Sequence, residues 1–143
     1  MLHSIRGILA VLGRLAIVTI FLMSAVGNKI PHFNDVVGFM RTNNVPYPEF
    51  LLPGAIVFLI AGSLSILVGY KARIGAVLLL VFLVMATYYF HNFWDKTDPA
   101  QQQEQMIQFM KNLSMMGTML FIMAVGAGPF SLDAKWSGTT VSS

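Results

Sequence analysis

The residues best suited to chemistry gather in two short segments, one rich in aromatic rings and one carrying amide and amine groups. Tyr88, His91 and Trp94 lie in Y-Y-F-H-N-F-W, and Lys111 and Asn112 lie in Q-F-M-K-N-L. Residues three or four apart share a face of a helix. A polar pocket with aromatic walls suits a flat molecule with carbonyl groups, such as a quinone. His91 or Lys111 would donate a hydrogen bond to its oxygen, while Tyr88 or Trp94 stacks on its ring.

Simpler roles stay open for the same residues. Aromatic and imidazole rings settle at membrane surfaces without any ligand, so His91 beside Trp94 also fits a purely interfacial position. A haem between His91 and His32 is disfavoured because only His91 lies in an apolar stretch. Six methionines at positions 106–123 offer thioethers for Cu(I), but methionine more often fills gaps between helices. We therefore expect no metal site and no resident cofactor, with quinone as the candidate ligand.

The composition indicates a membrane protein. Hydrophobic residues make up 56% of the 143-residue chain and charged residues only 10%, against about 25% charged in soluble domains. The nine lysines and arginines are scattered, which provides no continuous basic surface for nucleic acid. We expect the lipid bilayer to cover most of the surface, and we expect no nucleic acid partner.

Three charge-free stretches have the length of a membrane span. Residues 50–70, 74–94 and 112–132 each form 21 uncharged residues, and a helix of that length measures about 30 Å. A fourth apolar stretch, residues 8–27, contains Arg14. The sequence thus predicts an all-α integral membrane protein, a four-transmembrane-helix bundle in a single domain over residues 1–133, with a polar tail at 134–143.

Arg14 has two interpretations. We expect the first helix to be uncleaved, with Arg14 about two turns inside it, where a central arginine costs roughly 2.5 to 3.5 kcal/mol on insertion scales. Its side chain either snorkels back to the lipid headgroups or faces a polar gap between helices, where it would contact an anionic ligand or a partner. The second interpretation makes Arg14 a candidate binding residue.

The connections have their own patterns. Residues 33–40 carry apolar side chains at helical spacing, which predicts a short amphipathic helix in the membrane interface within the first outer loop. The V-P-Y-P turn follows, and we expect the second span to begin near Phe50 with Pro53 in its first turn. Within that span Ala61, Ser65 and Gly69 form a small-residue stripe for helix packing. A last helix should start near Ala100, after Asp98 and Pro99.

Orientation follows from the short turn between the second and third spans. That turn holds Lys71 and Arg73 without an acid, and positive short loops favour the cytoplasmic side. Five of the six acidic residues fall on the opposite side, so we expect both termini in the cytoplasm.

Seven short segments together resemble the DoxX family of small four-span membrane proteins. They occur in the family's order over nearly the whole chain: G-R-L (13–15), S-A-V-G-N-K (24–29), V-P-Y-P (45–48), L-V-G-Y-K-A-R (67–73), F-H-N-F-W (90–94), Q-F-M-K-N-L (108–113) and G-P-F-S-L-D (128–133). The resemblance implies a multi-pass protein of the bacterial inner membrane. In some relatives the family is linked to quinone-dependent redox chemistry, as in the membrane subunit of a thiosulfate:quinone oxidoreductase.

Two functions remain open on this basis. The first is a subunit associated with quinone-linked redox chemistry, with a site at the outer face and another membrane or redox protein as partner. The alternative is a non-catalytic accessory or scaffold subunit, and relatives of the surfeit-locus type act as cargo receptors. Family members commonly carry an acidic residue in the second span, where this chain has Phe58, Leu59 and Ile60. Arg14 therefore lacks that carboxylate, and the sequence does not decide whether the chain is itself an enzyme.

Overall fold

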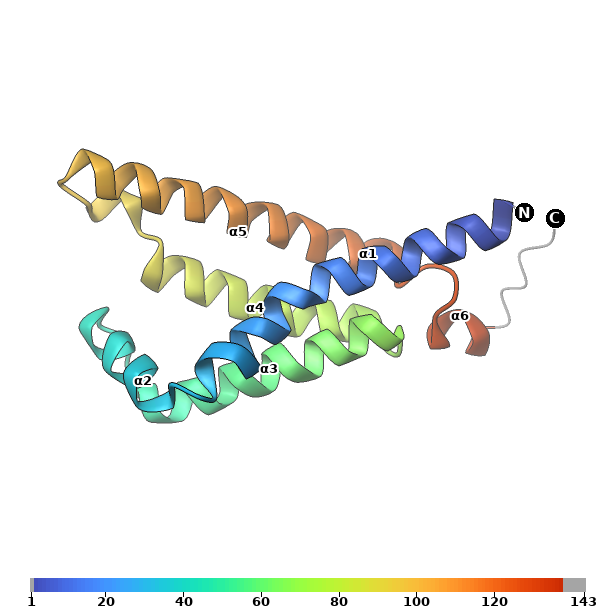
Figure 1. Ribbon diagram of the computed structural model, residues 1–143, viewed down its shortest axis with the longest axis horizontal. Helices are drawn as coiled ribbons and strands as arrows, with labels where there is room; N and C mark the ends of the chain where they lie inside the picture. Colours follow the sequence, from blue (N-terminus) through green and yellow to red (C-terminus); the bar gives the residue numbers. More distant parts are fainter. Residues whose placement is uncertain (1, 138–143) are drawn as a thin grey trace.

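The computed structural model describes residues 2–137, and within them every regular element is helical (Figure 1). The order along the chain is α1 (Leu2–Ser24), η1 (Ala25–Lys29), α2 (Phe33–Thr42), α3 (Pro48–Val68), α4 (Ala72–Phe90), η2 (Phe93–Asp95), α5 (Pro99–Val125) and α6 (Leu132–Trp136). The predicted all-helical class is confirmed. The expected polar tail lies partly in α6, and residues 138–143 are outside the described part.

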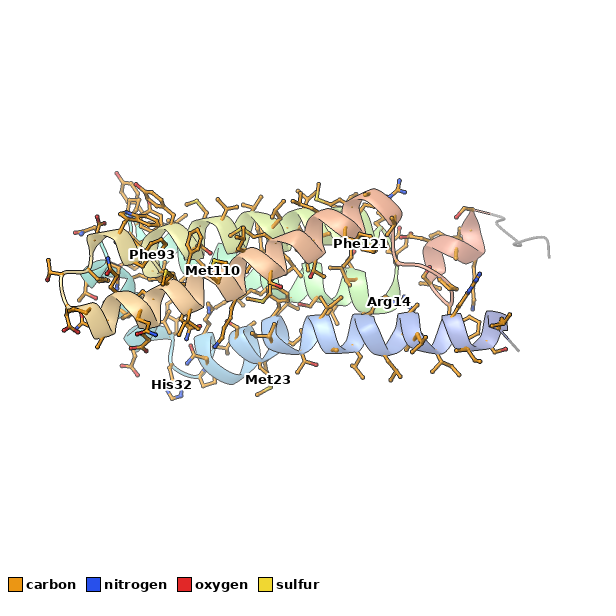
Figure 2. The ribbon with its side chains drawn as sticks, turned by 90° about the horizontal axis from the view of Figure 1, so that it is seen from above. Arg14, Met23, His32, Phe93, Met110 and Phe121 are labelled. Carbon is orange, nitrogen blue, oxygen red and sulfur yellow. The ribbon has the colours of Figure 1, made fainter. Side chains whose placement is uncertain are left out.

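The molecule has two distinct ends. The start of α1, the α3–α4 turn and α6 lie at one end, which we call the Arg14 end (Figure 1). At the opposite end lie α2, η2 and the start of α5, and we call this the Trp94 end. Figure 2 shows Arg14 and Phe93 far apart along the long axis. Residues from distant parts of the sequence are therefore collected at each end.

Helix α1 continues directly into η1, a five-residue π-helical turn. The wider turn is visible in the bond from the Ile30 N–H to the Ala25 carbonyl, at 3.0 Å, which joins residues five apart. The predicted first span lies within these two elements. The first turns of α1 extend past the α3–α4 turn in Figure 1, so Arg14 is level with that turn rather than deep inside the bundle.

Helix α2 covers the Trp94 end of the bundle. Val37 and Met40 are buried, and together with Val45 and Leu52 they form a small second core. Phe39 on the same helix stacks on Phe90 of α4, with ring centroids 5.2 Å apart. A short amphipathic helix is therefore present at the predicted position, and its apolar face packs on α3 and α4.

Helices α3 and α4 form an antiparallel hairpin. Helix α3 begins at Pro48, which occupies the first turn, where a missing N–H costs nothing. The prediction that Pro53 would fill this role is wrong, because Pro53 lies inside the helix. Gly69 ends α3 with φ of 71°, the left-handed conformation that glycine adopts without a steric penalty.

The hairpin packs closely through two glycines. A Cβ atom added to Gly62 would lie 2.9 Å from the carbonyl oxygen of Gly75, and one added to Gly75 would lie 2.7 Å from Ser65. Ala61 is exposed. The predicted stripe is thus correct for Ser65 but shifted at Ala61, because the backbones meet at Gly62, one residue further along the helix.

Helix α5 begins as predicted and returns along α4. The Asp98 side chain accepts a hydrogen bond from the Gln101 N–H at 3.0 Å and so caps the first turn. In packing, α5 lies against α4, and α1 lies against α3 on the other side of the hairpin. The main core joins all four helices around Val18, Leu59, Leu79 and Met119.

Three helices of the described part are long and apolar enough to cross a membrane. They cover Ser4–Lys29, Pro48–Val68 and Ala72–Asp95. The fourth predicted span, in α5, is not among them, because the first half of α5 carries glutamines, Glu104 and Lys111.

Candidate functional site

The Trp94 end brings the aromatic segment against the start of α5. Helix α4 ends at Phe90, and the tight turn η2 folds Phe93 and Trp94 back toward the bundle. Phe93, Trp94 and Phe109 form a group of edge-to-face rings whose centroids are 5.3 to 6.2 Å apart. This ring group fixes the direction of η2, and one face of Trp94 stays exposed.

A cleft of about 300 Å³ opens beside this ring group. Its walls come from three places in the sequence: the α2–α3 turn, the end of α4, and η2. It is lined by Asn43, Asn44, Tyr88, Tyr89, Asn92, Trp94 and Asp95. Of the predicted binding residues, Tyr88 and Trp94 therefore line one cleft. The amides of Asn43 and Asn44 were not predicted, although the N-N pair in a turn preceding two prolines was a visible signal.

His91 and Asn112 lie next to this cleft in helix-to-helix hydrogen bonds. The Nδ1 atom of His91 is 2.9 Å from Oε1 of Gln105 on α5. One turn away along α4, the Asn112 amide donates to Oγ1 of the buried Thr87 at 2.8 Å. These two pairs hold α4 against α5, and neither His91 nor Asn112 lines the cleft. Gln105 was not predicted as the partner of His91.

Lys111 and Arg14 are separate from this group. Lys111 is exposed on α5, although it is adjacent in sequence to Asn112. Arg14 lies at the opposite end of the molecule from Phe93 (Figure 2). The structure therefore brings four of the six candidate binding residues together at the Trp94 end: Tyr88, His91, Trp94 and Asn112.

Arg14 is buried, with 5% of its surface exposed, so the interpretation in which it snorkels is wrong. Its Nη2 donates to the carbonyl oxygen of Phe130 at 2.7 Å and its Nε to that of Ala10 at 3.2 Å. Its Nη1 has no hydrogen-bond partner and lies against Gly69, where an added Cβ would be 2.5 Å away. Arg14 thus ties α1 to the segment that follows α5.

Asp133 ties the same segment to the start of α4. Its two carboxylate oxygens accept hydrogen bonds from the N–H groups of Lys71 and Ala72, at 2.8 and 3.0 Å. Its own N–H donates to the Gly69 carbonyl at 2.8 Å. A carboxylate at a helix N-terminus is stabilised by the helix dipole and by otherwise unpaired N–H groups. Three separate sequence segments, G-R-L, G-Y-K-A-R and G-P-F-S-L-D, therefore meet at the Arg14 end.

Comparison with known proteins places these features in a family. A model of the DoxX family matches residues 9–92, more than half of the chain. The chain belongs to the DoxX family. It is 30% identical over 130 residues to the inner membrane protein YphA of Escherichia coli, covering 91% of both chains. It is also 30% identical over 122 residues to the inner membrane protein YqjF of E. coli, covering 82% of this chain and 87% of that protein.

A second family model, that of the SURF4 family, matches residues 53–137. The chain is also 28% identical over 80 residues to the ER-derived vesicles protein ERV29 of Saccharomyces cerevisiae, a match that covers 56% of this chain and 26% of that protein. No solved structure matches the chain. The DoxX match contains Arg14 and His91, the SURF4 match contains Asn112 and Asp133, and the two overlap over most of the α3–α4 hairpin.

Proposed function

We propose that this DoxX-family membrane protein is a small inner-membrane subunit of a quinone-linked redox system, with a quinone headgroup site in the cleft at the Trp94 end. The cleft is the observation that carries this proposal. Its volume of about 300 Å³ is at the lower end of ligand pockets, which span roughly 300 to 1,000 Å³. Tyr88 and Trp94 offer flat faces. The amides of Asn44 and Asn92 offer donors for carbonyl oxygens, since Asn92 uses one of its two amide hydrogens for Asp95.

The orientation that goes with this proposal has four spans and both termini in the cytoplasm. Because Asp133 binds the backbone at the start of α4 while Pro99 follows closely after its end, α5 runs the full length of α4. A bilayer crossed by α4 would then also be crossed by α5. Helix α2 would lie in the outer interface, since Asp35 is exposed on the face opposite Val37 and Met40.

The orientation is testable because the sequence contains no cysteine. Single cysteines at the exposed positions Thr97 and Ser137 report on the two ends of α5. We expect a membrane-impermeant maleimide to label Thr97→Cys in spheroplasts and Ser137→Cys only after lysis. Labelling of both from outside would contradict a spanning α5.

Quinone binding can be measured through the two tryptophans, which lie at opposite ends of the molecule. Quinones quench nearby indole fluorescence. In the Trp136→Phe variant only Trp94 emits, and we expect saturable quenching on titration with decylubiquinone in nanodiscs. In Trp94→Phe only Trp136 emits, and we expect no saturable component. Equal quenching of both variants would reject the cleft as the site.

A side-chain test then separates the cleft from the rest of the surface. We expect Tyr88→Ser to weaken decylubiquinone binding about tenfold. Stacking of a flat ring, such as a nucleic-acid base, on an aromatic side chain contributes about 1 to 3 kcal/mol to the binding free energy. Tyr70→Ser, at the Arg14 end, is the matched control and should leave the affinity unchanged.

A scaffold or accessory role is the second candidate, and one observation favours it. Lys111, Ser114 and Gly117 are exposed on one side of α5, and an added Cβ at Gly117 would meet no atom within 4 Å. Polar and small residues on the outer face of a membrane helix suit contact with another membrane protein. Purification in mild detergent tests this: Gly117→Leu should release a co-purifying membrane protein, whereas Gly54→Leu on α3, equally open, should retain it.

A further inference from the structure

Lys29 is turned toward the interior of the bundle at the end of α1. Its Nζ donates a hydrogen bond to Oγ of Ser24 at 2.6 Å and lies 5.4 Å from the centre of the Phe82 ring on α4. The lysine is only partly exposed. Neither Lys29 nor Phe82 lines the cleft at the Trp94 end, so this is a separate place in the molecule.

The π-helical turn η1 explains this direction. In an α-helix, residues five apart point about 140° away from each other, which would separate Lys29 from Ser24. In a π-helix the hydrogen bonds join residues five apart, so these side chains come to lie above one another. The extra residue of η1 therefore turns the lysine onto Ser24. Such π-helical insertions within α-helices frequently mark functional sites.

The ammonium points the opposite way from a snorkelling lysine. Ser24 lies one turn further into the candidate span Ser4–Lys29, so the charge is drawn toward the membrane interior rather than toward water. The ion pairs of the described residues are His32–Asp35 and Arg41–Glu49, and Lys29 belongs to neither. An ammonium has three donors, and Ser24 accepts only one. An ionisable group inside a membrane segment without an acidic partner points to a ligand.

The surroundings indicate what kind of ligand this is. Helix α1 packs on α3 and helix α5 packs on α4, and side chains of all four helices meet in the main core. Met115 and Met116 on α5 are partly buried against the main core, as is Phe82. Methionine is flexible and rearranges readily around apolar groups. Lys29 therefore combines a cation with the apolar Phe82 ring beside it, which matches an amphiphile with a polar oxygen at its head.

We propose that Lys29 is a binding residue for the head oxygen of an amphiphile that lies against α1 and α4, beside Ser24 and the Phe82 ring. The shared chemistry is a carbonyl or carboxylate oxygen that accepts hydrogen bonds from the ammonium. Such an oxygen occurs in a quinone or in a fatty acid. The quinone form of this inference rests on the proposed function, and the fatty-acid form does not.

The test titrates the full-length chain in nanodiscs with decylubiquinone and, separately, with palmitate, and follows bound ligand by native mass spectrometry. Lys29→Met keeps the length and packing of the side chain and removes the charge. We expect it to weaken binding of at least one probe about 10- to 100-fold, the range for loss of a hydrogen bond to a charged group. Lys135→Met removes the same charge from an exposed position on α6, at the Arg14 end, and should leave both affinities unchanged.

The outcomes separate this inference from the proposed function. Palmitate binding that depends on Lys29, without quinone binding, supports the Lys29 site and rejects the quinone-linked role. Quinone binding that depends on Tyr88, together with quinone and palmitate affinities that Lys29→Met and Lys29→Ala both leave unchanged, rejects the Lys29 site alone. If neither probe binds the wild-type chain, the Lys29 proposal is wrong. Circular dichroism and size-exclusion chromatography check that Lys29→Met and Lys29→Ala fold. Ser24→Ala leaves the lysine in place and should reduce the affinity less than either lysine variant.

Discussion

The Arg14 end and the Trp94 end are built in opposite ways. At the Arg14 end, side chains bind backbone groups of other segments: Arg14 binds the Phe130 carbonyl and Asp133 binds the N–H groups that open α4. At the Trp94 end, the side-chain hydrogen bonds between different segments join other side chains, as in His91 with Gln105 and Asn112 with Thr87, and Phe93, Trp94 and Phe109 contact edge to face. Contacts to backbone hold whole segments in place, whereas side-chain pairs can exchange partners. The Arg14 end is therefore suited to stability, and the Trp94 end contains the site that we propose for ligand binding.

The largest expected effect follows from adding one methyl group at the Arg14 end. In Gly69→Ala the new Cβ would lie 2.3 Å from Cβ and 3.0 Å from Cα of Ser131, at a φ of 71°. Left-handed backbone and overpacking together should cost about 2 to 4 kcal/mol in the free energy of unfolding. Denaturant titration in detergent, followed by circular dichroism, measures this. Gly54→Ala, on α3, has open space and should leave the free energy of unfolding unchanged. An equal loss of stability in Gly69→Ala and Gly54→Ala would show that the Arg14 end is not tightly packed.

Removal of the Arg14 side chain should have the next largest effect. Arg14→Ala leaves the Phe130 carbonyl without its charged donor, and we expect a loss of about 1.5 to 3 kcal/mol in unfolding free energy. Arg14→Lys should recover only part of this, because an ammonium cannot reproduce the fork of the guanidinium. Arg73→Ala is the control, since exposed Arg73 makes one long bond, 3.3 Å, to the Ala124 carbonyl. Full rescue by lysine would indicate that charge alone matters.

The same contrast shows how far the sequence could predict the structure. Helices depend on local patterns, so the all-helical class, the start of α5 after Asp98 and the apolar face of α2 were predictable. The partner of Arg14 was not, because it lies 116 residues away and is a backbone carbonyl, which leaves no signature in residue types. Because the second span has no acidic residue, the sequence suggested that Arg14 lacked a partner. Arg14 instead donates hydrogen bonds to the carbonyl oxygens of Phe130 and of Ala10 on its own helix.

At the Trp94 end the sequence predicted the residue types but not their pairing. Tyr88 and Trp94 share the cleft, as helical spacing and aromatic content suggested. Lys111 was grouped with Asn112, yet adjacent residues on a helix point about 100° apart, and only Asn112 faces α4. The direction of Lys29 depends on the π-helical turn, and regular helical spacing does not predict such an insertion.

A smaller effect is expected for the pair that joins α4 to α5. Thr87→Val and Asn112→Leu each remove one side of a 2.8 Å hydrogen bond in the membrane region. In double-mutant cycles, hydrogen bonds between membrane helices contribute about 0.6 kcal/mol on average to the free energy of unfolding, with a maximum of about 1.7 kcal/mol. We expect a coupling energy in that range from the unfolding of both single variants and the double variant. A coupling near zero would mean that the two helices are held by their apolar contacts alone.

The smallest effect on stability is expected at Tyr88, and it separates binding from folding most clearly. Tyr88 is 64% exposed and touches its neighbour Tyr89 edge to face, at 5.1 Å between ring centres. Substitutions at such surface positions usually change the unfolding free energy by less than about 0.5 kcal/mol, so Tyr88→Ser should unfold like the wild type. Since the same variant is expected to lose quinone affinity, the binding loss could not be ascribed to a damaged fold. A stability loss as large as that of Arg14→Ala would show that the cleft wall is a structural part of the bundle, and the contrast between the two ends would disappear.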